Sequence, residues 1–311
     1  MGLNKVNTPF YYDYSTWIRQ QFPFHVQKIS IDAGFTCPNR DGRLSTGGCI
    51  YCDNRTFTPS YCDCRLSVTE QLEKGKRFFA RKYPNMKYIA YFQAFTNTYG
   101  SIDHLASLYR EALAVEDVVG LVIGTRPDCI SNELLDLLED ISRQTFLMVE
   151  YGIESTNDKT LVRINRGHTF AQSCEAICLT HERGILTGGH IIIGLPGENA
   201  KESIRQAPQI SRLPLDVLKI HQMQIIRGTR LAQIYKETPF HIYSVHEYIE
   251  LTARYIQRLR KDLVIERFIS QSPKELLIAP QWGLKNQAFN DLFITYLKEQ
   301  KIYQGQLLME I

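Results

Sequence analysis

The stretch CPNRDGRLSTGGCIYC, residues 37–52, is the segment around which this chain is organised. It carries three cysteines, Cys37, Cys49 and Cys52, on a polar loop that contains glycine. Thiolates are soft ligands that suit zinc, copper(I) and iron–sulfur clusters. Three thiolates on one short loop therefore predict a metal site. Three rather than four ligands leave one coordination position open for chemistry.

A closed zinc site is the competing interpretation of this loop. Structural zinc takes four ligands, and Cys62 or Cys64 would supply the fourth because both lie a short distance downstream. An iron–sulfur cluster normally takes four cysteines as well. A cluster held by only three cysteines would leave one iron free to bind a substrate or cofactor.

Length and composition are those of an ordinary globular enzyme. The 311 residues are 44% hydrophobic and 22% charged, which allows a large core without support from metal or disulfides. A net charge of +3 permits nucleic-acid binding without arguing for it. Because the sequence shows neither a signal peptide nor a long apolar span, we expect a cytoplasmic protein. Its eight cysteines are then expected to be thiols or metal ligands rather than disulfides.

Six units of strand followed by helix succeed one another from residue 26. Alternating or continuous apolar runs predict strands at 26–31, 88–92, 118–123, 146–151, 187–193 and 217–224. Helical periodicity predicts helices at 67–83, 102–114, 132–142, 158–164, 170–183 and 200–213. This order predicts an α/β fold with a parallel sheet. Right-handed crossovers would wind the sheet into a barrel or partial barrel, and a doubly wound sheet is the alternative.

The chain divides into three predicted segments. Residues 1–25 form an aromatic lead-in, residues 26–229 the barrel, and residues 230–311 a C-terminal extension, rich in helix, that closes the barrel. Within the extension we expect helices at 245–261 and 287–299 and an apolar segment at 263–269. Polar or glycine-containing segments follow the predicted strands, and barrel enzymes place their active sites at that carboxyl-terminal face.

The strand-end motifs together resemble the radical S-adenosylmethionine (radical SAM) superfamily, and within it the uncharacterised YhcC-like family. After the cysteine loop come FQAFTNTYG (92–100), GTRPDC (124–129), YGIES (151–155), INRGH (164–168) and GLPGE (194–198). Superfamily members carry three cysteines after the first strand of a partial (β/α)6 barrel. The long gap before the second cysteine resembles the branch that contains the elongator catalytic subunit.

The resemblance implies a partial (β/α)6, TIM-like barrel and a [4Fe–4S] cluster on Cys37, Cys49 and Cys52, with S-adenosylmethionine bound to the open iron. It implies reductive cleavage of S-adenosylmethionine to a 5′-deoxyadenosyl radical that abstracts a substrate hydrogen. A flavodoxin- or ferredoxin-like protein would supply the electron. The elongator branch suggests tRNA modification, with a small metabolite or a protein as the alternative substrate. A zinc-stabilised binding module without catalysis is the competing class.

The same resemblance implies contacts between the cofactor and the first motifs after the cysteines. Gln93, Thr96 and Asn97 offer oxygens that would accept from the ammonium group of S-adenosylmethionine. Thr125 and Arg126 would lie beside its ribose and methionine portion. A plain polar loop is the alternative for the first group, and an ion pair between Arg126 and Asp128 is the alternative for the second.

Later motifs complete the implied cofactor site. Glu154 would accept from the ribose hydroxyls, and Arg166 would bind the carboxylate with its guanidinium fork. His190 occupies the position of a polar ribose ligand in some relatives. A mutual salt bridge of Glu154 with Arg166 and a core position for His190 are the alternatives. Lys219 and His221 alternate with apolar residues in their strand, and are candidates for substrate contact.

A basic segment near the C-terminus is the candidate nucleic-acid contact. Arg254, Arg258, Arg260 and Lys261 would form a helical basic face that meets tRNA phosphates. The alternative is an ordinary solvated helix face.

Overall fold

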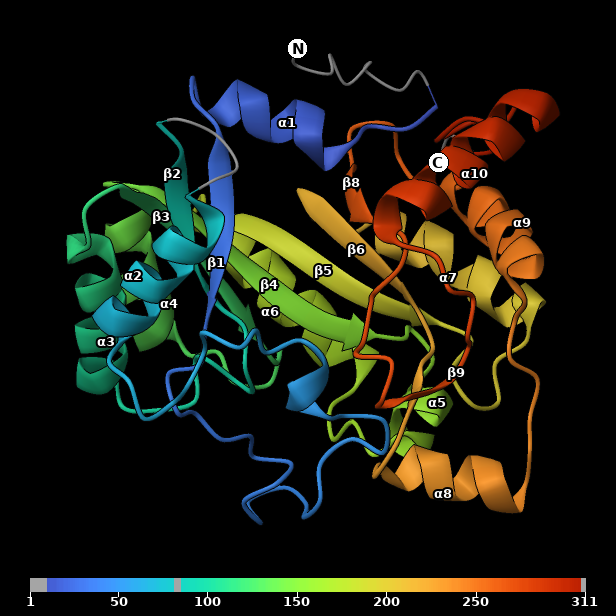
Figure 1. The fold of residues 1–311 in the computed structure, drawn as a ribbon, viewed down its shortest axis with the longest axis horizontal. Helices are drawn as coiled ribbons and strands as arrows, with labels where there is room; N and C mark the ends of the chain where they lie inside the picture. The colour runs from blue at the N-terminus through green and yellow to red at the C-terminus, as the bar shows by residue number, and fades with distance from the viewer. Residues whose placement is uncertain (1–9, 81–84, 309–311) are drawn as a thin grey trace.

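The main sheet is a curled half-barrel of parallel strands (Figure 1). The computed structural model describes residues 10–80 and 85–308. The strands run in the order β1 (Val26–Ile31), β2 (Lys87–Phe92), β3 (Val118–Thr125), β4 (Phe146–Glu154), β5 (Leu186–Ile193), β6 (Val217–Gln222), β8 (Val264–Arg267). Because each strand lies beside the next one along the chain and the order never reverses, the partial barrel is confirmed and the doubly wound sheet is excluded.

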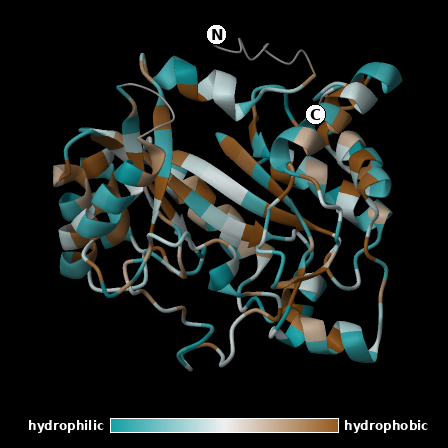
Figure 2. Ribbon diagram, in the orientation of Figure 1, coloured by the Kyte–Doolittle hydropathy of each residue, from teal (hydrophilic) through white to brown (hydrophobic). Residues whose placement is uncertain are grey.

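Helices cover the convex side and the ends of the sheet. Figure 2 shows apolar residues concentrated along the strands, with hydrophilic residues over much of the outer helices. The helices are α1 (Tyr14–Gln21), α2 (Val68–Phe79), α3 (Ile102–Ala114), α4 (Asn132–Ser142), α5 (Asp158–Arg163), α6 (Phe170–Glu182), α7 (Ala200–Ser211), α8 (Arg230–Glu237), α9 (Val245–Ile256) and α10 (Asn286–Gln300). A 3₁₀ turn, η1 (Asn54–Thr56), follows the cysteines, and β7 (Ile225–Ile226) pairs antiparallel with β9 (Leu277–Ala279). None of the described helices is both long and apolar enough to cross a bilayer.

Most predicted elements lie within a few residues of their expected positions. The predicted end of the helix at 81–83 falls on residues outside the described part of the chain. The lead-in forms α1, which lies across the amino-terminal ends of the strands (Figure 1). The boundaries at residues 25 and 229 stay predictions.

The predicted C-terminal extension contributes a seventh strand to the sheet. The apolar segment at 263–269 contains β8, which pairs parallel with β6. On its other side β8 meets the lead-in, where the Ile265 amide donates to the Tyr12 carbonyl at 2.8 Å. Sequence periodicity left this segment unassigned because a four-residue strand is too short to show alternation.

The predicted helical basic face is wrong as a helix. α9 ends at Ile256, so Arg258, Arg260 and Lys261 lie in the turns beyond it. The Arg260 guanidinium donates to the carbonyls of Ser211, Leu213 and Leu215 and thereby fixes the segment that leads into β6. Arg260 consequently lies at the amino-terminal end of the strands, far along them from the carboxyl-terminal loops.

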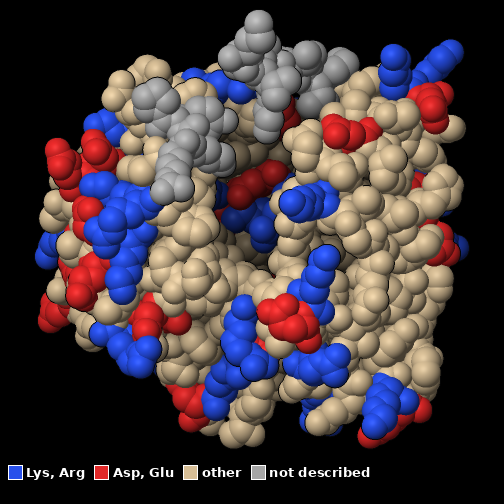
Figure 3. Space-filling model, viewed as in Figure 1, with Lys and Arg blue, Asp and Glu red and all other residues tan. Residues whose placement is uncertain are grey.

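Inward-facing side chains form successive layers inside the half-barrel, because side chains alternate across each strand. At the amino-terminal end, Trp17 of α1 packs with Val122, Met148, Val217 and Val264 into an apolar plug. The next layer toward the carboxyl-terminal end is charged. Figure 3 shows acidic and basic side chains deep inside the central hollow of the molecule.

The charged layer is a closed ring of four side chains from four strands. Lys28 contacts Glu150 at 3.1 Å and Glu266 at 2.8 Å, and Lys219 contacts the same two carboxylates at 2.6 Å and 3.3 Å. Tyr91 adds its hydroxyl, 3.2 Å from the Lys219 ammonium. Since Lys28 lies on β1 and Glu266 on β8, this ring joins the two edge strands of the sheet.

Burial and mutual attraction together set the charges in this ring. Burial alone would raise the pKa of Glu150, but the ammonium groups of Lys219 and Lys28 lower it well below the usual carboxyl value. Burial lowers the pKa of Lys219 to about 8, against the opposing effect of Glu150 and Glu266. At neutral pH both lysines and both carboxylates are therefore charged, and the ring is balanced.

Removing one carboxylate should unbalance the ring and destabilise the fold. We expect Glu150→Gln to lower the free energy of unfolding by about 3 kcal/mol, because it leaves two buried ammonium groups sharing Glu266. Urea denaturation followed by circular dichroism measures this change. In the double variant Glu150→Gln/Lys219→Met, Lys28 and Glu266 remain as a matched pair, so about 1 kcal/mol or more should return. A loss below about 1 kcal/mol in the single variant would contradict this account of the ring.

Candidate functional site

A pocket opens at the carboxyl-terminal ends of the strands, directly above the charged ring. Its walls include all three cysteines, Cys37, Cys49 and Cys52. They also include seven of the eight residues predicted to contact the cofactor: Gln93, Thr96, Thr125, Arg126, Glu154, Arg166 and His190. The eighth, Asn97, is buried behind the wall, where its amide donates to the carbonyls of Phe92 at 3.1 Å and Gly124 at 2.8 Å.

The cysteine loop folds back on itself between its first and second cysteines. The Gly48 amide donates to the Asn39 carbonyl at 2.8 Å, which closes the long gap into a compact lobe. Gly48 has a φ of +78°, and a Cβ there would lie 2.8 Å from Nε of Arg40. The glycine thus allows Arg40 to cross the loop and donate to the Cys52 carbonyl at 2.9 Å.

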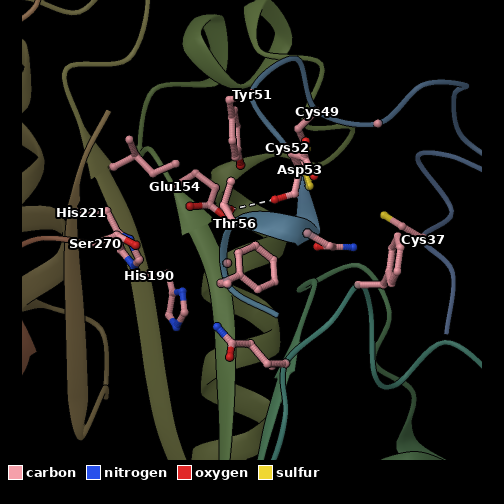
Figure 4. A pocket seen from close by; sticks show the side chains of 18 of the residues that line it. Cys37, Cys49, Tyr51, Cys52, Asp53, Thr56, Glu154, His190, His221 and Ser270 are labelled. Carbon is pink, nitrogen blue, oxygen red and sulfur yellow. Dashed lines mark hydrogen bonds between the residues drawn. The ribbon is translucent and has the colours of Figure 1, made fainter. Parts of the chain in front are cut away.

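The donors at this end of the pocket fit an iron–sulfur cluster. Figure 4 shows Cys49 and Cys52 together and Cys37 apart from them. Within the described residues, no three His, Cys, Asp or Glu side chains are gathered as around one metal ion. Each thiolate of a [4Fe–4S] cluster binds a different iron, so its three sulfurs need not meet at a point.

Cationic and amide groups lie beside these thiols. Nη1 of Arg166 lies 3.6 Å from the Cys49 sulfur, and the Asn39 amide lies 3.7 Å from it. Burial, followed by the neighbouring Cys49, raises the pKa of the Cys52 thiol to about 11. The arginines oppose this effect by favouring the thiolate, which is the form that binds metal.

The two remaining loop cysteines lie outside the pocket walls. Cys62 donates its thiol hydrogen to the Ser30 carbonyl at 2.7 Å, and burial raises its pKa to about 12. Cys64 is exposed. Cys37, Cys49 and Cys52 therefore line one pocket, and Cys62 and Cys64 do not.

Glu154 and Arg166 face each other across the pocket wall. Their closest atoms lie 3.5 Å apart, and both side chains are nearly buried. Glu154 has a φ of +67° and lies at a register shift between β4 and β5. A non-glycine residue in this left-handed region carries a conformational cost, and such positions gather at functional sites. Gly152 makes the approach of Arg166 feasible, because a Cβ there would lie 2.4 Å from its Nη2.

Arg126 is engaged in a tight local ion pair. Its guanidinium donates to both carboxylate oxygens of Asp128, at 2.9 Å and 2.8 Å, and to the Arg166 carbonyl at 2.8 Å. The ion pair that the sequence left as an alternative is thus present. Arg126 supports the backbone of Arg166, and its neighbour Thr125 shares a 2.5 Å hydrogen bond with Thr98.

Gln93 and Thr96 differ in whether their side chains are free to hydrogen-bond a ligand. The side-chain oxygen Oε1 of Gln93 already accepts from the Ser30 hydroxyl at 2.9 Å. The Thr96 hydroxyl is buried and has no partner among the described residues. Thr96 therefore has a free hydrogen-bonding group inside the protein, which a bound ligand would satisfy.

The opposite wall of the pocket comes from β5, β6 and the segment after β8. His190 interacts with Glu150 at 3.2 Å, so it is tied to the charged ring rather than surrounded by apolar core. His221 lines the pocket, whereas Lys219 lies below it within the ring. Burial and the adjacent Arg267 lower the pKa of His221 well below its usual value, which keeps the His221 imidazole neutral.

Sequence reasoning missed several residues of this pocket. Tyr51 stands between the second and third cysteines and points into the cavity (Figure 4). Arg267 ends β8 and Ser270 follows it, and both line the far wall. The rule that polar residues at strand ends line the site would have found Arg267 and Ser270, had the segment been assigned as a strand.

Comparisons with known proteins agree with this geometry. The Radical SAM superfamily model matches residues 39–205, and the Radical_SAM C-terminal domain model matches residues 215–299. Protein YhcC of Escherichia coli is 33% identical over 258 residues, covering 83% of this chain and 82% of YhcC. Elongator complex protein 3 of Saccharomyces cerevisiae is 27% identical over 184 residues, covering 58% of this chain and 32% of that protein.

A solved structure has the same fold. The Elp3 protein of the archaeon Methanocaldococcus infernus superposes with a TM-score of 0.67 at 18% identity, covering 90% of this chain and 64% of that one. The family models together cover most of the pocket and the strands β2 to β6 and β8 of the sheet that supports it. The chain belongs to the radical SAM superfamily, whose members bind a [4Fe–4S] cluster and S-adenosylmethionine.

Proposed function

We propose that this protein is a radical SAM enzyme whose cluster is held by Cys37, Cys49 and Cys52. The chemistry that these cofactors supply is reductive cleavage of S-adenosylmethionine to methionine and a 5′-deoxyadenosyl radical, followed by abstraction of a substrate hydrogen. The observation that supports the proposal most strongly is that all three cysteines of the loop line the same pocket as seven of the eight predicted cofactor contacts.

Residues beside the cysteines would hold S-adenosylmethionine. Glu154 would accept from the ribose hydroxyls, and Arg166 would pair with the carboxylate while remaining close to Cys49. Thr96 offers its unpaired hydroxyl to the ammonium, with Gln93 beside it. An indirect role is proposed for Asn97, Thr125 and Arg126, which would hold the neighbouring backbone and side chains of the cofactor site in place. His190 would approach the ribose from β5.

The surrounding chain would shield this chemistry from water. Residues 53–57 follow the third cysteine beside the pocket, and Asp53, Asn54, Thr56 and Phe57 line it. Exclusion of water would protect a reactive intermediate until it meets its substrate.

Radical SAM enzymes need an electron donor. We propose a flavodoxin- or ferredoxin-like protein in that role.

We propose tRNA as the substrate. The similarity to Elongator complex protein 3 supports this assignment, together with groups at the pocket rim suited to a nucleotide. Phe57 lines the pocket and is partly exposed, so a base could stack on it. We therefore propose Phe57, in place of Arg254, Arg258, Arg260 and Lys261, as the nucleic-acid contact nearest the site.

Loss of one cluster cysteine should remove the iron. We expect Cys49→Ala, purified and reconstituted without oxygen, to hold less than about one iron per chain, against about four in the wild type. Cys64→Ala is the matched control, because Cys64 lies outside the pocket and should not affect iron content. Iron analysis and the visible absorption of the cluster provide the measurement. A colourless zinc protein, or equal iron in both variants, would contradict the assignment.

Glu154 is expected to contribute directly to cofactor affinity. Glu154→Gln should raise the dissociation constant of S-adenosylmethionine about tenfold, because a charged acceptor of the ribose hydroxyls is lost. Anaerobic equilibrium dialysis with the reconstituted protein measures it. Glu182→Gln, at the exposed end of α6, is the control, and equal melting temperatures would show that the fold is intact. A change smaller than about twofold would argue against a ribose contact.

The tRNA assignment predicts a missing nucleoside. In cells that lack this gene, liquid chromatography with mass spectrometry of digested tRNA should show the loss of a modified nucleoside or the accumulation of its precursor. A plasmid that encodes the wild-type protein should restore the profile, whereas the Cys49→Ala protein should not. An unchanged profile under several growth conditions would count against tRNA.

A further inference from the structure

Arg267 is a pocket cation without a carboxylate partner. Other cations around the pocket floor have one: Lys28 and Lys219 share two carboxylates, and Arg166 faces Glu154. In the part of the chain that the structure describes, Arg267 makes no salt bridge, and its Nε is buried without a hydrogen-bond acceptor. Its Nη2 lies 3.0 Å from Nε2 of His221. A partly desolvated guanidinium left in this state is costly, and a bound anion would remove that cost.

His221 presents a second free donor at the same wall. Arginine only donates, so Nε2 of His221 must accept from Arg267, and the neutral ring carries its proton on Nδ1. Within residues 10–80 and 85–308, this Nδ1 has no hydrogen-bond acceptor. The His221 ring lies 5.4 Å from that of His190, which places it above the charged ring.

Ser270 supplies a third donor and is held rigidly. Figure 4 shows it next to His221. Its amide donates to the Gln222 side chain at 2.8 Å, and its carbonyl accepts from the amides of Gln222 at 2.8 Å and Gln224 at 3.1 Å. With the backbone fixed on both sides, the Ser270 hydroxyl is the group left without a partner among the described residues.

These three donors come from β6, β8 and the turn after β8, across the pocket from the cysteines. We propose that Arg267, His221 and Ser270 form a subsite for an oxyanion of the substrate, a phosphate or a carboxylate. The guanidinium would bind two oxygens of either group with its fork, and the other two donors would complete the contacts. The proposal deepens the proposed function, because it rests on a substrate that occupies the same barrel as S-adenosylmethionine.

The position of this subsite gives it a defined consequence. Glu154 ends β4, the middle strand of the sheet, and Arg166 follows α5, whereas the three donors lie on β6, on the edge strand β8 and just beyond β8. An anion fixed there would hold the rest of the substrate between the two walls. The subsite would then select substrates that carry the anion at a set distance from the reacting carbon.

Anion binding to the reconstituted protein tests the subsite. In the presence of S-adenosylmethionine, the melting temperature is followed against inorganic phosphate and, separately, acetate, with ionic strength held constant by chloride. We expect one of them to raise the melting temperature saturably. A response to phosphate alone supports a phosphorylated substrate, and a response to acetate alone supports a carboxylate. Arg267→Gln should raise the apparent dissociation constant at least about tenfold.

Companion variants separate the subsite from general effects of charge and folding. Arg267→Lys keeps the charge but loses the fork, so its affinity should fall between those of the wild type and Arg267→Gln. Ser270→Ala should weaken binding several-fold, roughly the effect of one neutral hydrogen bond. Arg254→Gln, on the exposed face of α9, is the matched control and should titrate as the wild type does.

Three results would contradict the proposed subsite. The first is no stabilisation of the wild type by either anion, and the second is equal titrations of the wild type and Arg267→Gln. The third is a tenfold loss of S-adenosylmethionine affinity in Arg267→Gln, which would assign Arg267 to the cofactor instead. Repeating the titration on protein without cluster or S-adenosylmethionine separates this test from the proposed function. Anion binding that depends on Arg267 there would support the subsite even if no 5′-deoxyadenosine were ever formed.

Discussion

The ring of Lys28, Glu150, Lys219 and Glu266 is the constraint on which the rest of this structure depends. A sheet of parallel strands that stops short of a full barrel has two open edges. Here Lys28 on one edge strand contacts Glu266 on the other at 2.8 Å, and Glu150 with Lys219 completes the circuit through the middle strands. The ring thus stabilises the curl of the sheet from inside. Backbone hydrogen bonds join only neighbouring strands, so they do not connect β1 directly to β8.

The same ring determines what lies above it. Side chains two residues apart on a strand share a face, so two of the ring members are followed toward the carboxyl end by a pocket residue. Glu150 is followed by Gly152, and Lys219 by His221. Gly152 contributes no side chain, which leaves room for Arg166 to reach Cys49. These pocket residues therefore lie only two residues along their strands from the charges that stabilise the barrel.

The sequence contained most of the fold and one side of the site. Alternation and turn chemistry located the strands, and the carboxyl ends of parallel strands necessarily meet at one edge, so the cysteines and most predicted cofactor contacts were found together. Partners across the barrel were not predictable. Nothing in the run FLMVEY indicates that Glu150 faces two lysines, because that pairing is created by the curl of the sheet.

The far wall was missed for a related reason. β8 has four residues, and short strands give no usable period. Without that strand, Arg267 was only part of an apolar segment at 263–269 with no assigned role, whereas it ends a strand and lines the pocket. Arg260, seven residues earlier, looked equivalent in the sequence, yet it binds backbone carbonyls before β6. The two arginines differ in function because Arg260 precedes β8 and Arg267 ends it. The residue type alone does not distinguish them.

The two ion pairs at the cofactor side differ in a way that bears on ligand binding. Arg126 and Asp128 make two short charge-assisted bonds, at 2.9 Å and 2.8 Å, which a ligand would have to replace in full. Glu154 and Arg166 share a single contact at 3.5 Å, and Glu154 holds a left-handed backbone conformation to make it. Breaking this weaker contact costs less, and Arg166 would stay in place through its 2.6 Å hydrogen bond to the Gly152 carbonyl. Under the proposed function, Glu154 and Arg166 would therefore exchange each other for a ribose and a carboxylate, while the tightly paired Arg126 and Asp128 would keep the wall in place.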